Sequence, residues 1–125
     1  MGVEINLLKN YPQQNRNTSE RALEKNEKIR QIARKFDVEF FDTERKYGYG
    51  GFTYNKKFWG PVVPTFKEYW NLNSSSSILD VGCAKGFMVY DFVEQIKGIN
   101  IKGIDISNYA IEKAKEEVKD RLSVG

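Results

Sequence analysis

The feature that most constrains the fold is the stretch 77–88, where an apolar run meets an acidic residue and then a turn of small residues. The apolar run 78–81 predicts a buried strand, and the residues after Gly86 have the apolar spacing of a helix. A strand that passes through a tight glycine-containing loop into a helix is the place where open α/β sheets hold nucleotide-like ligands. We therefore expect a ligand site at this loop.

A second apolar run, 99–106, follows the helix and carries Asp105 near its end. Strand, helix and strand in this order predict two parallel strands joined by a right-handed crossover. We expect the crossover helix over 87–97, ended by Gly98, and a further helix over 108–119. The fold class is therefore α/β.

The residues before this unit form a different kind of sequence. Apolar spacing predicts a helix over about 18–35, and the segment 40–70 is dense in aromatic residues and glycine. These aromatic residues either pack the segment onto a core or line a pocket. We place the domain boundary at the run of serines, giving an N-terminal extension over 1–73 and the start of a second domain over 74–125.

Composition limits the classes of function. The chain has 125 residues, a formal net charge of +3, one cysteine and no histidine. The mild charge does not by itself argue for nucleic acid, the lone cysteine excludes an internal disulfide, and a structural zinc site is disfavoured. With no secretory signal and no long apolar run, we expect a soluble cytoplasmic protein.

Two familiar glycine-loop patterns do not fit this loop. A phosphate-binding P-loop needs four residues between its glycines and a lysine after the second, whereas three residues separate Gly82 from Gly86 and Phe87 follows. The dinucleotide fingerprint needs glycine at positions that Ala84 and Phe87 occupy.

The pattern of Asp80, Gly82, Ala84 and Gly86 resembles instead the first motif of the class I S-adenosylmethionine-dependent methyltransferases. Asp105 lies 19 positions past Gly86, close to the offset at which a carboxylate reaches ribose hydroxyls. The resemblance extends to the runs 45–52, 58–59, 61–63, 80–87, 103–107 and 109–111.

The resemblance implies S-adenosyl-L-methionine as cofactor and a Rossmann-like methyltransferase fold. It assigns the ribose to Asp105 and the adenine face to Ile106. Cys83 is expected to pack through its side chain, and Lys85 to be exposed to solvent. The implied cofactor-binding residues are Asp80, Gly82, Cys83, Ala84, Gly86, Asp105 and Ile106.

No catalytic residue and no metal ligand is assigned. Methyl transfer needs a general base only when the acceptor must lose a proton. Asp91, Glu94, Tyr47 and Tyr49 are candidates by residue type alone.

The family fold has seven strands, and the sequence supplies the first two. We therefore expect the N-terminal part of a methyltransferase domain, truncated after its second strand, which alone binds cofactor weakly and turns over little or nothing. One alternative is a non-catalytic cofactor-binding or interaction module left by truncation. A less favoured one is a fragment of a nucleotide-dependent oxidoreductase. A small-molecule methyl acceptor is favoured over nucleic acid, no membrane partner is expected, and uncovered strand edges favour self-association.

Overall fold

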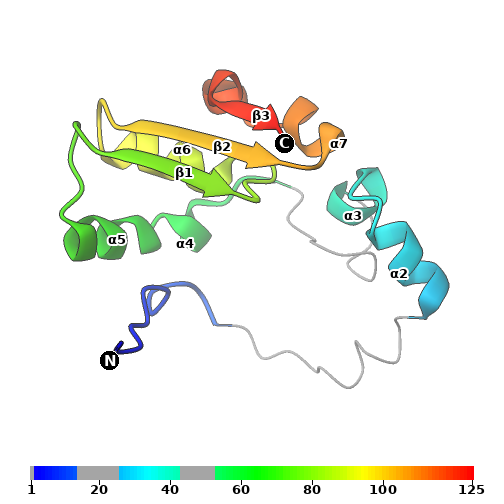
Figure 1. Cartoon of the computed structure of the whole chain (residues 1–125), viewed down its shortest axis with the longest axis horizontal. Helices are drawn as coiled ribbons and strands as arrows, with labels where there is room; N and C mark the ends of the chain where they lie inside the picture. The colour runs from blue at the N-terminus through cyan, green and yellow to red at the C-terminus, as the bar shows by residue number, and fades with distance from the viewer. Residues whose placement is uncertain (1, 14–25, 43–52) are drawn as a thin grey trace.

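The computed structural model describes residues 2–13, 26–42 and 53–125. Its centre is a parallel sheet of β1 (Ser77–Val81), β2 (Asn100–Asp105) and β3 (Leu122–Val124), in that spatial order (Figure 1). The predicted α/β class with parallel strands is confirmed. The prediction ended the sheet after two strands, but β3 adds a third, because Leu122 pairs with Gly103 and its side chain is buried.

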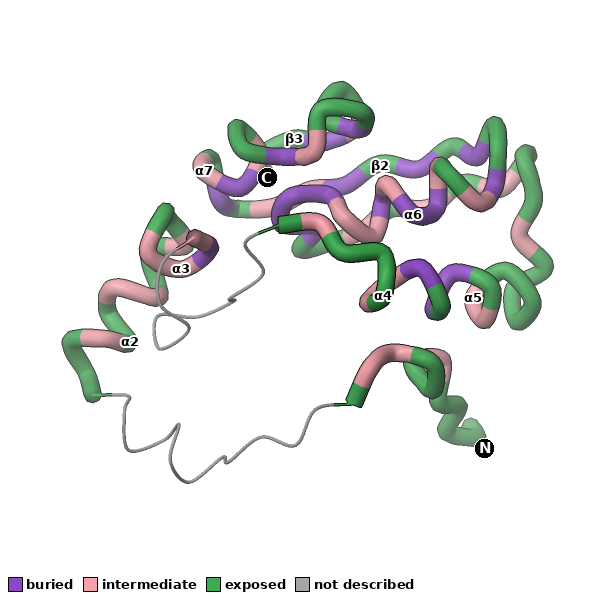
Figure 2. The backbone as a smooth tube through the Cα atoms, turned by 180° about the vertical axis from the view of Figure 1, so that it is seen from behind, coloured by how far each residue is buried: buried purple, intermediate pink, exposed green. Residues whose placement is uncertain are grey.

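Helices pack on one face of this sheet. They are α4 (Lys56–Trp59), α5 (Val62–Trp70) and α6 (Phe87–Gln95), and α6 lies directly against β2 (Figure 1). Buried residues gather along β2 and α6 (Figure 2). This core contains Val63, Cys83, Val89, Phe92, Ile96, Ile99, Ile101, Ala114, Val118 and Leu122.

The other face of the sheet is uncovered in the described part of the chain. Register places Leu79 beside Lys102 and Val81 beside Ile104, and residues paired in this way point to the same side of a parallel sheet. Leu79 is 57% exposed and Val81 is 73% exposed. The prediction of a buried strand over 78–81 is therefore wrong for half of its residues, because the described helices cover one face only.

The predicted helix over 108–119 is divided into two pieces. The α-helix α7 (Asn108–Glu112) is capped by the Ser107 hydroxyl, which accepts a hydrogen bond from the Ala110 N–H at 3.0 Å. A 3₁₀ helix, η2 (Glu116–Arg121), follows. Between them the Lys115 N–H donates at 3.0 Å to the carbonyl of Lys85, in the loop after β1, and this contact turns the chain out of the helical path.

The N-terminal extension lies on two parts of this unit. Residues 2–13 are irregular and lie on α4 and α5, where the Tyr11 ring packs on Phe58 and Trp59. The helices α2 (Glu27–Ala33) and α3 (Val38–Asp42) lie near the carboxyl ends of the strands (Figure 1).

The helix predicted over 18–35 is found only in part, as α2, and its predicted course through residue 26 is wrong, because Asn26 is an extended N-cap whose side chain accepts from the Ile29 N–H. Residues 18–25 lie outside the described residues. Much of the glycine-rich half of the segment 40–70, including Tyr47 and Tyr49, also lies outside them. Among the described helices, none is long and apolar enough to cross a membrane.

Candidate functional site

The loop between β1 and α6 is fixed at the carboxyl ends of β1 and β2. The N–H groups of Gly82 and Cys83 donate to the Ile104 carbonyl at 2.8 and 3.0 Å. Gly82, Ala84 and Gly86 have φ values of 81°, 50° and 78°. Glycine tolerates this left-handed region, whereas alanine adopts it at a cost of about 1 to 2 kcal/mol.

The two loop glycines leave room for different neighbours. A Cβ on Gly86 would lie 2.7 Å from Leu122 Cδ1 and 3.2 Å from Val118 Cγ2, so this glycine lets α6 approach η2 and β3. At Gly82, apart from the glycine itself and its two chain neighbours, no heavy atom in the described part of the chain lies within 4 Å of the Cβ position. Gly82 therefore presents bare backbone to open space, where a ligand can approach.

Asp105, at the end of β2, is held by two backbone donors. Its Oδ2 accepts from the Ala84 N–H at 2.8 Å, and its Oδ1 accepts from the Ser107 N–H at 2.9 Å. Each carboxylate oxygen has a second lone pair, so both can still accept hydroxyl donors. The positive φ of Ala84 directs its N–H to this carboxylate, which ties the loop after β1 to the end of β2.

A cavity of about 390 Å³ opens at these strand ends. Its walls are mostly apolar, with the Asp105 carboxylate and the loop backbone as polar groups. It is lined by Phe36, Phe40, Phe41, Val81, Gly82, Ala84, Ile104, Asp105, Ile106 and Gly125. Four of the predicted cofactor-binding residues thus line one cavity: Gly82, Ala84, Asp105 and Ile106.

Asp80 is not among the residues that line this cavity. It lines a second, mainly apolar cavity of about 670 Å³ beside β1, together with Phe66, Trp70 and Met88 among others. Burial and the nearby charge of Asp105 raise the pKa of Asp80 to about 6. A cation that approaches Asp80 in this second cavity would favour its ionised form.

Cys83 packs rather than reacts. It is 6% exposed, and a side chain on Gly103 would collide with its Cβ and Sγ. Burial, with the charges of Asp80 and Asp105, raises the pKa of this thiol to about 12, so it is protonated at neutral pH. The prediction that Cys83 is a small packing residue agrees with this geometry.

The expectation that Lys85 is exposed is wrong. Its residue exposure is 4%, and its Nζ makes an ion pair with Asp42 Oδ1. Asp42 Oδ2 also accepts a hydrogen bond from the Tyr109 hydroxyl at 2.5 Å. Lys85 is buried because α3 lies over the loop, and this docking involves residues 43 positions apart in the sequence.

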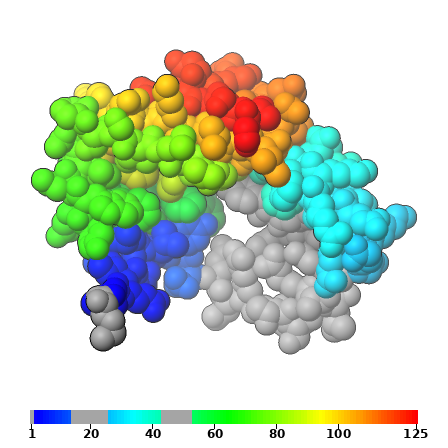
Figure 3. Space-filling model, in the orientation of Figure 1, coloured from blue at the N-terminus to red at the C-terminus, as the bar shows by residue number. Residues whose placement is uncertain are grey.

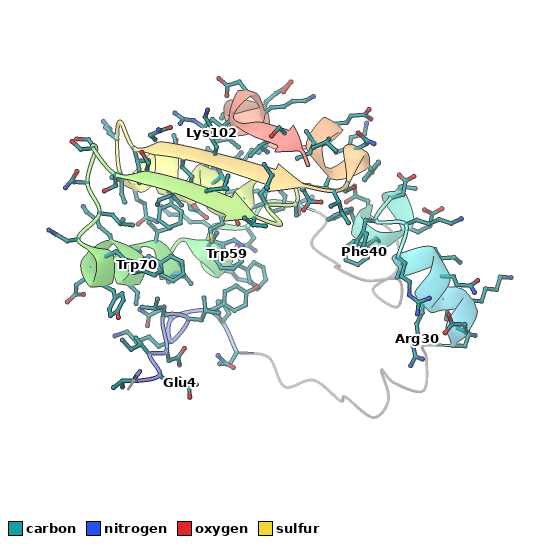
Figure 4. The ribbon with its side chains drawn as sticks, in the orientation of Figure 1. Glu4, Arg30, Phe40, Trp59, Trp70 and Lys102 are labelled. Carbon is teal, nitrogen blue, oxygen red and sulfur yellow. The ribbon has the colours of Figure 1, made fainter. Side chains whose placement is uncertain are left out.

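Sequence reasoning did not assign the three phenylalanines of the cavity wall. Phe40 and Phe41 were noted only as part of an aromatic segment that either packs or lines a pocket, and Phe36 only as part of a helical face. Both outcomes occur: Phe41 is 2% exposed and packs with Ala84 and Ala110, yet it also lines the cavity. Figure 4 shows Phe40 on the sheet-facing side of α3.

The candidate bases do not meet at this cavity. Asp91 is 1% exposed on α6, and its Oδ1 accepts from the Tyr54 hydroxyl at 2.5 Å. Burial raises the pKa of Asp91, partly offset by the hydrogen bond from Tyr54. Glu94 does not line the cavity, and Tyr47 and Tyr49 lie outside the described residues. Within the described ranges, no group of three acidic, cysteine or histidine residues could hold a metal ion.

Residues 72–123 match the model of a family described as a methyltransferase domain. This match confirms, over that segment, the resemblance predicted from the sequence. Together with the parallel sheet it supports the predicted fold class, a partial Rossmann-like methyltransferase fold. The division of the chain at residue 73 stays a prediction.

Two solved structures are similar to parts of the chain. The structure of MccD protein is 25% identical over 50% of this chain and 29% of its own, with a TM-score of 0.43. The structure of YjhP from E. coli is 22% identical over 78% of this chain and 36% of its own, with a TM-score of 0.45. The chain thus spans about a third of the length of these two structures. No curated protein matches the sequence at a significant level.

Proposed function

We propose, from the methyltransferase domain model that residues 72–123 match, that this chain is the cofactor-binding portion of an S-adenosylmethionine-dependent methyltransferase. The observation that carries the proposal is the cavity at the carboxyl ends of β1 and β2, which the bare backbone of Gly82 lines together with Asp105 and Ile106. Ligands of open α/β sheets bind at this edge.

The groups present suit such a cofactor. Asp105 has lone pairs for ribose hydroxyls, and Ile106, which is 63% exposed, offers an apolar surface for adenine. Asp80 supplies negative charge for the cationic amino-acid end, on the other side of β1. A side chain at Gly82 would project into the space that the ligand needs.

S-adenosylmethionine supplies a methyl group on a sulfonium centre, which an acceptor takes by in-line displacement. The contribution of this chain is to hold the cofactor in a fixed orientation, which can account for much of the rate of such a reaction. We further propose a small-molecule acceptor, since the net charge of +3 is too modest to favour nucleic acid.

The test is calorimetric titration of the 125-residue chain with S-adenosylmethionine and with S-adenosylhomocysteine. We expect saturable binding that Asp105→Ala abolishes, because the ribose loses its acceptor. Gly82→Ala should also weaken binding at least tenfold, while its left-handed φ costs the fold about 1 to 2 kcal/mol.

Asp120→Ala is the matched control, because Asp120 is an exposed acid on η2 that lies outside the cavity. Circular dichroism verifies that each variant is folded. A folded wild-type chain that binds neither ligand would refute the proposal, and so would equal affinities for the wild type, Asp105→Ala and Gly82→Ala. Saturable binding of a nicotinamide dinucleotide instead would favour the oxidoreductase alternative.

A further inference from the structure

The α2–α3 segment, residues 26–42, forms one wall of the cavity that the proposed function uses. Phe36 and Phe40 line it together with Asp105 and Ile106. Both phenylalanines are half-buried, so each ring keeps some accessible surface, and the two rings meet edge to face with centroids 4.9 Å apart. In Figure 3 this segment, in cyan, lies against the orange and red end of the molecule, which contains the chain after β2.

The first anchor of this wall is a constrained backbone position. Phe36 has a φ of 48°, in the left-handed region that bulky residues rarely adopt. Its carbonyl accepts a hydrogen bond from the Ser107 hydroxyl. The Ser107 N–H in turn donates to Asp105 Oδ1, so the wall is connected through one residue to the carboxylate of the cavity. Strained positions of this kind occur often at ligand sites.

The second anchor is at the other end of α3. Asp42 pairs with Lys85, in the loop after β1, and accepts from the hydroxyl of Tyr109, on α7. Phe41 fills the space between the anchors and packs on Tyr109, with ring centroids 6.4 Å apart. The two anchors hold the wall against both strand ends that carry the cavity.

We propose that Phe36 and Phe40 form the nucleoside-binding wall of the cofactor site, so that the α2–α3 segment is part of that site and not only a packing extension. This inference rests on the proposed function. Both phenylalanines line the same cavity as Asp105 and Ile106, whereas Asp80 lines the separate cavity beside β1. The wall therefore contacts the adenosine part of the cofactor, and the methionine part lies beyond it.

The experiment titrates wild type and Phe40→Ala with S-adenosylmethionine and with adenosine. Loss of one aromatic contact should lower the affinity for both ligands by a similar factor, about tenfold. Tyr69→Ala is the control, because Tyr69 is 51% exposed on α5 and lies outside the cavity. It should leave both affinities unchanged.

A second measurement needs no substitution. In the wild-type chain with bound adenosine, nuclear Overhauser effects should connect the adenine protons to the rings of Phe36 and Phe40. Unchanged adenosine affinity in a folded Phe40→Ala variant would overturn the inference. A loss of affinity confined to S-adenosylmethionine would also overturn it. The absence of nuclear Overhauser effects between the adenine protons and these rings would do the same. If wild type binds neither ligand, the proposed function itself fails, so the two failures are distinguishable.

Discussion

Asp80 is the residue at which stability and binding most clearly oppose each other. Its carboxyl is partly buried at the end of β1, near the charge of Asp105, and its pKa rises from 3.8 to about 6. The folded chain therefore holds an acid whose ionised form is unfavourable until a cation approaches. Proteins often keep such unfavourable groups where function needs them.

We predict that the free energy of unfolding falls as pH rises from about 4 to about 6. The folded pKa lies above the unfolded value of 3.8, so below pH about 4 both states are protonated and no penalty applies. Between these values the unfolded state releases its proton first, which favours unfolding by about 3 kcal/mol, and above pH about 6 the penalty is constant. Urea unfolding across this range measures the effect.

Asp80→Asn is the variant that tests the assignment. It should remove this part of the pH dependence, raise the stability at neutral pH by about 3 kcal/mol and weaken the binding of S-adenosylmethionine. Asp120→Asn, at an exposed acid, should behave as wild type. A pH profile that Asp80→Asn leaves unchanged would assign the dependence to another group.

At this scale the sequence predicts the residues whose roles are local. Gly82, Ala84 and Gly86 could be predicted because a tight loop needs small residues at fixed spacing, and Asp105 because its offset places it at the next strand end. The environment of Lys85 could not, because its burial depends on Asp42, which lies far away in the chain. The role of Phe40 could not be predicted either. Its sequence context shows only that it belongs to an aromatic segment, and the docking of α3 shows that it lines the cavity.

The α3 helix is an element whose position depends on tertiary contacts. It has five residues, too few to be a stable helix alone, so tertiary contacts must hold it. Asp42 makes two of these contacts, with the buried Lys85 and with Tyr109.

We predict that Asp42→Asn lets α3 open locally. The substitution removes the charge that Lys85 pairs with, and breaking a buried pair costs about 3 to 5 kcal/mol. Relative to the wild type, hydrogen exchange should accelerate more at the α3 amides than at the amides of α6, a helix that packs in the main core. Glu112→Gln, at an exposed acid on α7, is the control. Unchanged exchange at α3 would show that other contacts suffice.

Among the larger elements, β1, α6 and β2 were predicted within one or two residues, because apolar periodicity is a local signal. The helix over 108–119 was predicted too long. Its periodicity continues through Lys115, but a hydrogen bond to Lys85 stops the helix, and that bond exists only in the folded chain. β3 was missed as a formed strand because three residues carry too little pattern.

The whole molecule has a sheet that is only partly covered. In the described part of the chain β1 pairs with β2 alone, and its side chains Leu79 and Val81 are exposed on the face without helices. An exposed strand edge beside apolar side chains is a template for pairing with another chain. Composition and periodicity gave no warning of the exposed face, because residues 78–81 have the sequence of a strand buried on both sides.

We predict that the chain self-associates through β1 in a concentration-dependent way. Leu79→Lys should suppress this association, because lysine side chains on an edge strand oppose strand pairing and the charge replaces part of the exposed apolar surface. The same change should leave the melting temperature of the monomer nearly unaltered, since Leu79 is already 57% exposed. Sedimentation velocity at several protein concentrations measures the association.

Val3→Lys is the matched control, because Val3 is 84% exposed and lies in the N-terminal segment away from the sheet. It introduces the same charge and removes a similar apolar surface, so it separates a specific β1 interface from a general effect of net charge. Equal suppression by both variants would contradict pairing through β1 and point to non-specific association. Suppression by Leu79→Lys alone would assign the interface to the edge that the three-stranded sheet leaves open.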